Sequence, residues 1–178
     1  MSISKLKTKA GVFLFILSFF SLFTACGIYS FSGASIPAGA KTISIAFFPN
    51  KAPLVVPSLS QQFTESLQDI FSSQTQLILV ERNGDLQISG EITDYSILPQ
   101  AISGAGAGGQ QTGQLNRITI TVNVRFVNKL EPDKDFETTF SDYTDESSDV
   151  NLDNPTSQID IINDKLVENI FNKAVVNW

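Results

Sequence analysis

The chain has 178 residues, with 12 Lys and Arg against 18 Asp and Glu, and it contains one cysteine and no histidine. Three basic residues lie within the first nine positions and every acidic residue lies later, so residues 26–178 carry nine positive and 18 negative charges, a formal charge of −9. Nucleic-acid binding depends on clustered cations and is therefore disfavoured. Without histidine or a second cysteine, the commonest zinc ligands, general bases and thiol nucleophiles are missing, which disfavours most classes of enzyme.

The first 25 residues have the layout of an export signal. Lys5, Lys7 and Lys9 give a positive start, and residues 10–23 form an apolar stretch without any charge. This stretch is too short to cross roughly 30 Å of hydrocarbon as a permanent helix. We therefore interpret residues 1–25 as a signal peptide that is removed.

Cys26 is the expected site of a lipid anchor. It follows Phe23-Thr24-Ala25, and small residues before a cysteine suit a lipoprotein signal peptidase. Acylation explains an unpaired cysteine in an exported chain, and the alternative is a small buried thiol after an ordinary cleavage site. Two or three fatty chains make a stable anchor, because each buried methylene contributes about 0.8 kcal/mol. Residues 27–30 contain no acidic retention signal, so we expect the periplasmic side of the outer membrane.

The mature chain begins with a tether and then a strand and a helix. Residues 26–40 are rich in Ser, Gly and Pro and are predicted to link the lipid to a single domain over residues 41–178. Ile43, Ile45 and Phe47 alternate along a first strand that ends at Pro49. Ser58-x-x-Gln61 is a capping-box signature. A helix to about residue 72 is predicted by the apolar residues that follow at helical spacing, namely Leu59, Phe63, Leu67, Ile70 and Phe71.

The middle of the chain reads as strands joined by turns. Residues 77–80 predict a short buried strand, and Asn83-Gly84 predicts a two-residue hairpin turn. The returning strand places Leu86, Ile88, Gly90 and Ile92 on one face. A loop rich in Gly, Ala and Gln is expected over residues 100–116.

The last third predicts two strands and a long helix. Residues 117–126 alternate strictly between polar and apolar side chains, as one face on a core requires. A fifth strand opens at Phe136 and Phe140 and fades near Tyr143, before an acidic loop to residue 153. Asn154-Pro155 is expected to begin a terminal helix whose broad apolar face includes Phe171 and Trp178.

The predicted order is strand, helix, four strands, helix. This order indicates an α+β fold in which two amphipathic helices pack on one face of a four- to five-stranded mixed, mostly antiparallel sheet.

A set of short segments, in order along the chain, resembles the LptE-type lipopolysaccharide-assembly lipoproteins. The likeness is closest to the branch found in Bacteroidota, and it is carried by residues 27–33, 41–45, 48–50, 59–61, 85–90, 116–120 and 170–172 and by Trp178. It implies a protein that is not an enzyme and needs no cofactor. Such a protein sits inside the LptD β-barrel, helps it to assemble, and assists delivery of lipopolysaccharide to the outer leaflet.

Two other functions stay open at this stage. A stand-alone periplasmic lipid-binding lipoprotein would need a large interior cavity. A hydrolase of surface glycans could use paired carboxylates such as Glu91 and Asp94, although nothing around them marks them as catalytic.

Two sequence patterns resemble ligand-binding motifs, one for a dinucleotide and one for calcium, but neither fits its motif well. Residues 104–109 match a dinucleotide fingerprint as a string, yet they lie between two antiparallel strands, so a flexible loop along a partner is the better interpretation. Five acidic residues lack the spacing and the glycine of a calcium loop, which favours a solvated turn. They are Asp142, Asp145, Glu146, Asp149 and Asp153.

Arg117, Arg125 and Lys129 form the candidate contact site. The two-residue period of a strand puts all three on its polar face. They could meet lipid A phosphates or acidic groups of a barrel lumen. The alternative is that they are charges on a solvated sheet face.

Overall fold

The structure, a computed structural model, describes residues 36–54, 56–101, 114–147 and 155–175. These residues all belong to one unit, Gly33–Trp178. The expected signal peptide, Cys26, Trp178 and the glycine-rich residues 104–109 lie outside the described residues.

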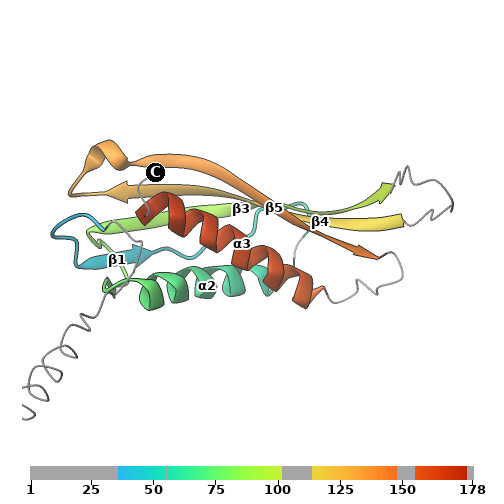
Figure 1. Cartoon of the computed structure of the whole chain (residues 1–178), viewed down its shortest axis with the longest axis horizontal. Coiled ribbons are helices and arrows are strands. Elements are labelled where there is room, and N and C mark those ends of the chain that lie inside the picture. Colours follow the sequence, from blue (N-terminus) through green and yellow to red (C-terminus); the bar gives the residue numbers. More distant parts are fainter. Residues whose placement is uncertain (1–35, 55, 102–113, 148–154, 176–178) are drawn as a thin grey trace, which may run out of the picture. The chain divides into compact units, whose positions relative to one another are not determined.

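Five strands form one mixed sheet in the order β2-β1-β3-β4-β5 (Figure 1). Strand β1 pairs in parallel with β2 and β3, whereas β4 pairs antiparallel with β3 and β5. A short 3-10 helix, η2 (Pro132–Lys134), joins β4 to β5. The strands are β1 (Thr42–Ile45), β2 (Ile78–Leu79), β3 (Leu86–Ala101), β4 (Gln114–Asn128) and β5 (Phe136–Ser147).

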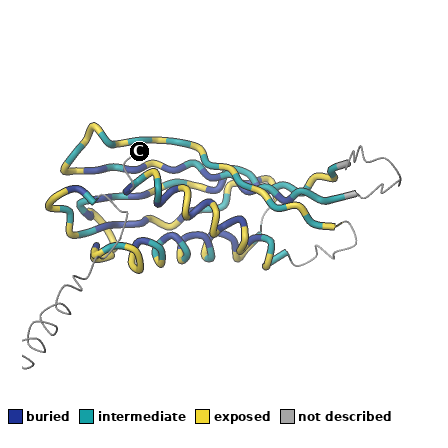
Figure 2. The backbone as a smooth tube through the Cα atoms, in the orientation of Figure 1, coloured by how far each residue is buried: buried dark blue, intermediate teal, exposed yellow. Residues whose placement is uncertain are grey.

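Helices α2 (Leu59–Gln74) and α3 (Thr156–Val175) lie side by side over one face of this sheet (Figure 1). Their apolar stripes meet the inward residues of β3 and β4, and Figure 2 shows the buried backbone concentrated between the two layers. The rings of Phe71 and Phe171 meet edge to face, with centroids 5.1 Å apart, and join the helices directly. The predicted α+β class and the predicted element order are confirmed.

The predicted hairpin between residues 77–80 and the following strand is wrong. β1 lies between β2 and β3, so residues 80–85 cross over β1 on the face away from the helices. The Gly84 N–H donates to Ser44 Oγ at 3.2 Å, and a Cβ on Gly84 would lie 2.6 Å from the Ser44 amide nitrogen. Asn83 has a φ of 60°, but Gly84 has no positive φ, so the predicted two-residue turn does not form. A local turn signal cannot reveal that a distant strand is inserted between its neighbours.

Two expectations about local structure are also corrected. Ser58 is the N-cap of α2, but its side chain makes no capping hydrogen bond. Gln61 donates instead to Glu65 Oε1 at 2.8 Å, one helical turn further on, so the capping box does not form. Ile78 and Leu79 of β2 are 64% and 40% exposed rather than buried, because this strand lies at the edge of the sheet.

Strands β3, β4 and β5 are longer than the sequence pattern predicts. β3 continues to Ala101, β4 begins at Gln114, and β5 continues to Ser147. Parts of the predicted glycine-rich and acidic loops are therefore strand. Residues 102–113 and 148–154 lie outside the described residues.

Candidate functional site

The sheet face away from the helices is mostly polar, and Leu98, Leu115 and Val127 are its apolar residues in β3 and β4. A register shift between Ile92 and Asp94 makes Thr93 an extra residue in β3, so Ile92 and Tyr95 are both buried. This bulge keeps the polar side chains of β3 on the same face as those of β4 and β5. The face is formed by Gln87, Ser89, Glu91, Asp94 and Ser96 of β3, Arg117, Thr119, Thr121, Asn123 and Arg125 of β4, and Glu137, Thr139, Ser141, Tyr143 and Asp145 of β5.

Arg117 is held by β5 across this face. Its Nε and Nη2 donate to the two carboxylate oxygens of Asp145 at 2.7 Å each, and its guanidinium carbon lies 3.8 Å from the centre of the Tyr143 ring. The hydrogen bonds from Arg117 lower the pKa of Asp145 and raise the pKa of Arg117 itself. The guanidinium N–H groups of Arg117 that could bind a phosphate therefore already bind the Asp145 carboxylate.

Arg125 lies eight residues further along β4, about 27 Å away at roughly 3.4 Å per residue. It is exposed, and among the described residues no acidic group forms an ion pair with it. Arg125 and Arg82 both line a hollow of about 600 Å³ on the polar face, beside β1 and the crossover. Ser44, Glu81, Asn83 and Gln87 also line it.

Lys129 lies just beyond the end of β4 rather than on the polar face. Its Nζ donates to the carbonyl oxygen of Asn83 at 3.0 Å, and its backbone N–H donates to that of Asp85 at 3.0 Å. The structure thus gathers Arg125 and Lys129 at one end of the sheet and separates Arg117 from them. Arg82, which sequence reasoning missed as a site residue, joins this end because the crossover carries it there.

A family model described as lipopolysaccharide-assembly, LptE, matches residues 40–174 of this polar-faced α+β chain. The chain belongs to the LptE family. Members of this family are non-enzymatic lipoproteins of lipopolysaccharide assembly and are associated with the outer membrane. A search of curated proteins gives no match to the chain.

Several solved structures are similar to this LptE-family chain over most of its length. A minor lipoprotein from Acinetobacter baumannii is 15% identical, with a TM-score of 0.47 over 75% of this chain and 91% of that one. A neuraminyllactose-binding hemagglutinin homolog from Helicobacter pylori is also 15% identical, with a TM-score of 0.49 over 82% and 88% of the two chains. A lipoprotein from Neisseria meningitidis is 12% identical, with a TM-score of 0.41 over 74% and 99%.

The remaining candidate residues of the LptE-family chain lie on strands where the structure describes them, and Asp149 and Asp153 lie outside the described residues. Asp142 and Glu146 alternate with Asp145 along β5, and Asp94 accepts a hydrogen bond from Ser96 Oγ at 3.1 Å. Among the described residues, no group of three or more Asp, Glu, Cys or His could hold a metal ion. Within the same residues, no helix is long and apolar enough to cross a membrane.

Proposed function

We propose that this LptE-family lipoprotein is the subunit that plugs an LptD-type β-barrel, assists its assembly, and helps deliver lipopolysaccharide to the outer leaflet. The observation that carries the proposal is the division of the sheet into one face covered by helices and one face made mostly of hydroxyl, amide and charged groups. The lumen of a large outer-membrane barrel is polar and wet. A polar sheet face can hydrogen-bond to such a wall without burying unpaired groups.

The proposal includes the anchor and the origin of the chain. Acylated Cys26 would hold the domain at the periplasmic side of the outer membrane, with residues 27–40 as the tether. The assignment to the Bacteroidota branch stays a prediction from the ordered sequence segments. A stand-alone lipid carrier is less well supported, because apolar side chains fill the space between helices and sheet in the described residues.

Contact with lipopolysaccharide is assigned within the proposal to the end of the sheet that carries Arg125, with Arg82 and Lys129 beside it. A guanidinium group donates two parallel hydrogen bonds to a phosphate, and Arg82 and Arg125 line one hollow. The sequence also predicts a contact role for Arg117, which would require Arg117 to leave Asp145.

Purification from membranes under mild detergent tests the plug proposal. We expect a stoichiometric complex of this lipoprotein with one very large β-barrel protein, and we expect depletion of the lipoprotein to reduce both mature barrel and surface lipopolysaccharide. A Cys26→Ala chain that carries an ordinary secretory signal peptide in place of residues 1–25 is the control for the role of the lipid. If the lipoprotein purifies alone and depletion changes neither quantity, the proposed function is wrong.

A further inference from the structure

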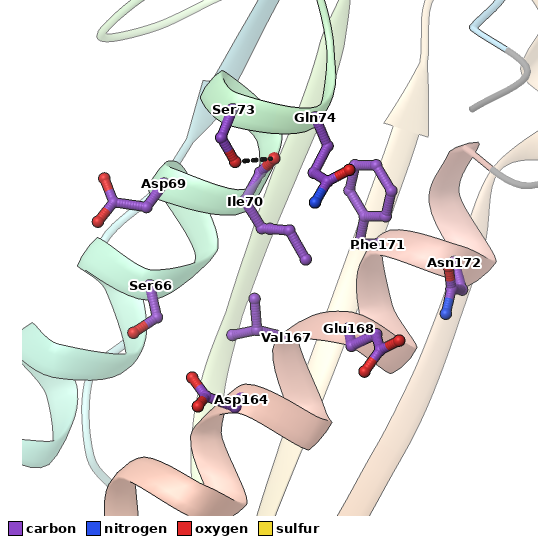
Figure 3. A pocket seen from close by; sticks show the side chains of 10 residues that line it. All are labelled: Ser66, Asp69, Ile70, Ser73, Gln74, Asp164, Val167, Glu168, Phe171 and Asn172. Atoms are coloured by element: carbon purple, nitrogen blue, oxygen red, sulfur yellow. Dashed lines mark hydrogen bonds between the residues drawn. The ribbon is translucent and has the colours of Figure 1, made fainter. Parts of the chain in front are cut away.

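Helices α2 and α3 leave a groove between them on the side away from the sheet (Figure 3). It has a volume of about 540 Å³ and runs from Ser66 and Asp164 at one end to Gln74 and Asn172 at the other. Ile70, which is partly buried, forms most of its accessible apolar surface, since Val167 and Phe171 are only 3% and 7% exposed. Three carboxylates line it as well, namely Asp69, Asp164 and Glu168, and all three are exposed.

No cation of the two helices neutralises these carboxylates. α2 contains no Lys or Arg, and α3 contains only Lys165 and Lys173. Lys165 Nζ lies 3.4 Å from Asp142 Oδ1 and donates to the Tyr143 carbonyl oxygen at 2.9 Å, while Lys173 Nζ lies 5.2 Å from the centre of the Phe136 ring. Both lysines therefore turn toward β5 and away from the groove.

The groove therefore has a negative electrostatic potential. Among the described residues, Asp69, Asp164 and Glu168 form no ion pair. They do not form a group that could hold a metal ion either. An elongated groove with an apolar floor and an unneutralised negative field is complementary to an extended ligand that carries both positive charges and apolar side chains.

We propose that the α2–α3 groove binds a peptide segment of a protein partner in which Lys or Arg residues alternate with apolar ones. The apolar side chains would pack on Ile70 and on the small exposed parts of Val167 and Phe171, and the cations would pair with the three carboxylates. This inference goes beyond the proposed function and does not depend on it, because the groove lies on the opposite side of the molecule from the polar sheet face. An anionic lipid surface would be repelled by the same field.

The test uses the full lipoprotein in a non-ionic detergent and a fluorescent 12-residue peptide that alternates Arg and Leu. Binding is followed by anisotropy, with an alternating Ser and Leu peptide for comparison. We expect the Asp69→Asn, Asp164→Asn, Glu168→Gln variant to bind the Arg peptide about tenfold more weakly. The control variant Glu65→Gln, Asp133→Asn, Asp160→Asn removes equal charge from exposed positions outside the groove and should change the affinity less than twofold.

A second measurement locates the peptide independently of charge. A photocrosslinking residue at Ser66, in the groove, should capture the Arg peptide, whereas the same residue at Ser89, on the polar sheet face, should not. Equal loss of affinity in the two charge variants, equal binding of both peptides, or crosslinking at Ser89 alone would overturn the inference. Because the assay contains no barrel protein, its failure leaves the plug proposal untouched, and failure of copurification leaves this one untouched.

Discussion

Asp85 and Thr42 are joined by reciprocal hydrogen bonds where the crossover ends and β1 begins. The Thr42 backbone N–H and hydroxyl donate to Asp85 Oδ2 at 3.0 and 2.9 Å, and the Asp85 N–H donates to Thr42 Oγ1 at 2.9 Å. The Lys41 N–H donates to the same carboxylate oxygen at 2.9 Å. One carboxylate thus ties the start of β3 to the start of β1, two segments more than 40 residues apart.

These bonds make the stability of the fold depend on pH. They lower the pKa of Asp85 below its ordinary value of 3.8, first through the Lys41 N–H and then through Thr42. A group whose pKa is lower in the folded state stabilises that state above its unfolded pKa and stops doing so as the pH falls through the folded one. We therefore expect urea midpoints to fall as the pH is lowered below about 4.

Asp85→Asn isolates this contribution. At pH 7 the variant should unfold at a lower urea concentration than the natural chain, and the difference should shrink as the pH falls below 3.8. The matched control is Asp133→Asn, at an exposed position in η2, which should lower the midpoint at neither pH. An Asp85→Asn deficit that is the same at pH 7 and pH 3 would contradict the assigned cause.

The crossover also explains why glycine is needed at position 84. A Cβ there would lie 2.6 Å from the Ser44 nitrogen and 2.7 Å from the Ile43 carbonyl carbon, both of them backbone atoms that cannot move aside cheaply. We predict that Gly84→Ala destabilises the fold by about 1–3 kcal/mol. Ser89→Ala, at an exposed β3 position, should cost less than about 0.5 kcal/mol. Urea unfolding of the two variants at one pH compares them, and equal stabilities would show that the crossover is not tightly packed.

The elements were predictable where the signal was local. Strict alternation around Ile120 located β4, and the stripe through Phe63 and Leu67 located α2. What failed required knowledge of distant partners. Asn83-Gly84 lies in a crossover and not in a hairpin turn, because β1 is inserted between β2 and β3. The bulge at Thr93 shifts the later residues of β3 in a way that a two-residue period does not predict.

The candidate site was predictable only in part, for the same reason. The strand period placed Arg117 and Arg125 on one face correctly. It could not show that Asp145, expected in a loop, belongs to β5 and forms an ion pair with Arg117. Nor could it show that Arg82 reaches the Arg125 hollow, because the path of the crossover over β1 is a property of the assembled sheet.

Arg82 and Arg125 should therefore contribute to lipopolysaccharide binding, whereas Arg117 should contribute to stability. We predict that Arg82→Gln and Arg125→Gln each weaken binding of lipopolysaccharide to the purified lipoprotein several-fold at low salt, with little change in thermal stability, because neither has an ion pair in the described residues. Arg117→Gln should leave that binding unchanged and lower the melting temperature slightly, since it releases Asp145 and uncovers Tyr143. Binding at two salt concentrations and melting curves measure both effects. If Arg117→Gln alone weakened binding, the contact would have to be reassigned to the other end of β4.

The last prediction concerns two buried asparagines, Asn128 and Asn163. Each is only 1% exposed, but the two differ in their hydrogen bonds. Asn128 Oδ1 accepts from the N–H groups of Leu130 and Glu131 at 3.0 Å each and so shapes the turn after β4. Asn163 on α3 has no partner for either side-chain polar atom among the described residues. An unpaired buried amide costs free energy that an apolar side chain of similar size avoids.

We predict that Asn163→Leu leaves stability unchanged or raises it by about 1 kcal/mol, whereas Asn128→Leu lowers it by about 1–3 kcal/mol, because two backbone N–H groups lose their acceptor. Equilibrium urea unfolding at pH 7 gives both values in one series. A loss at Asn163 comparable to that at Asn128 would mean that the Asn163 amide does have a partner in solution, and an ordered water beside α3 would be the first candidate.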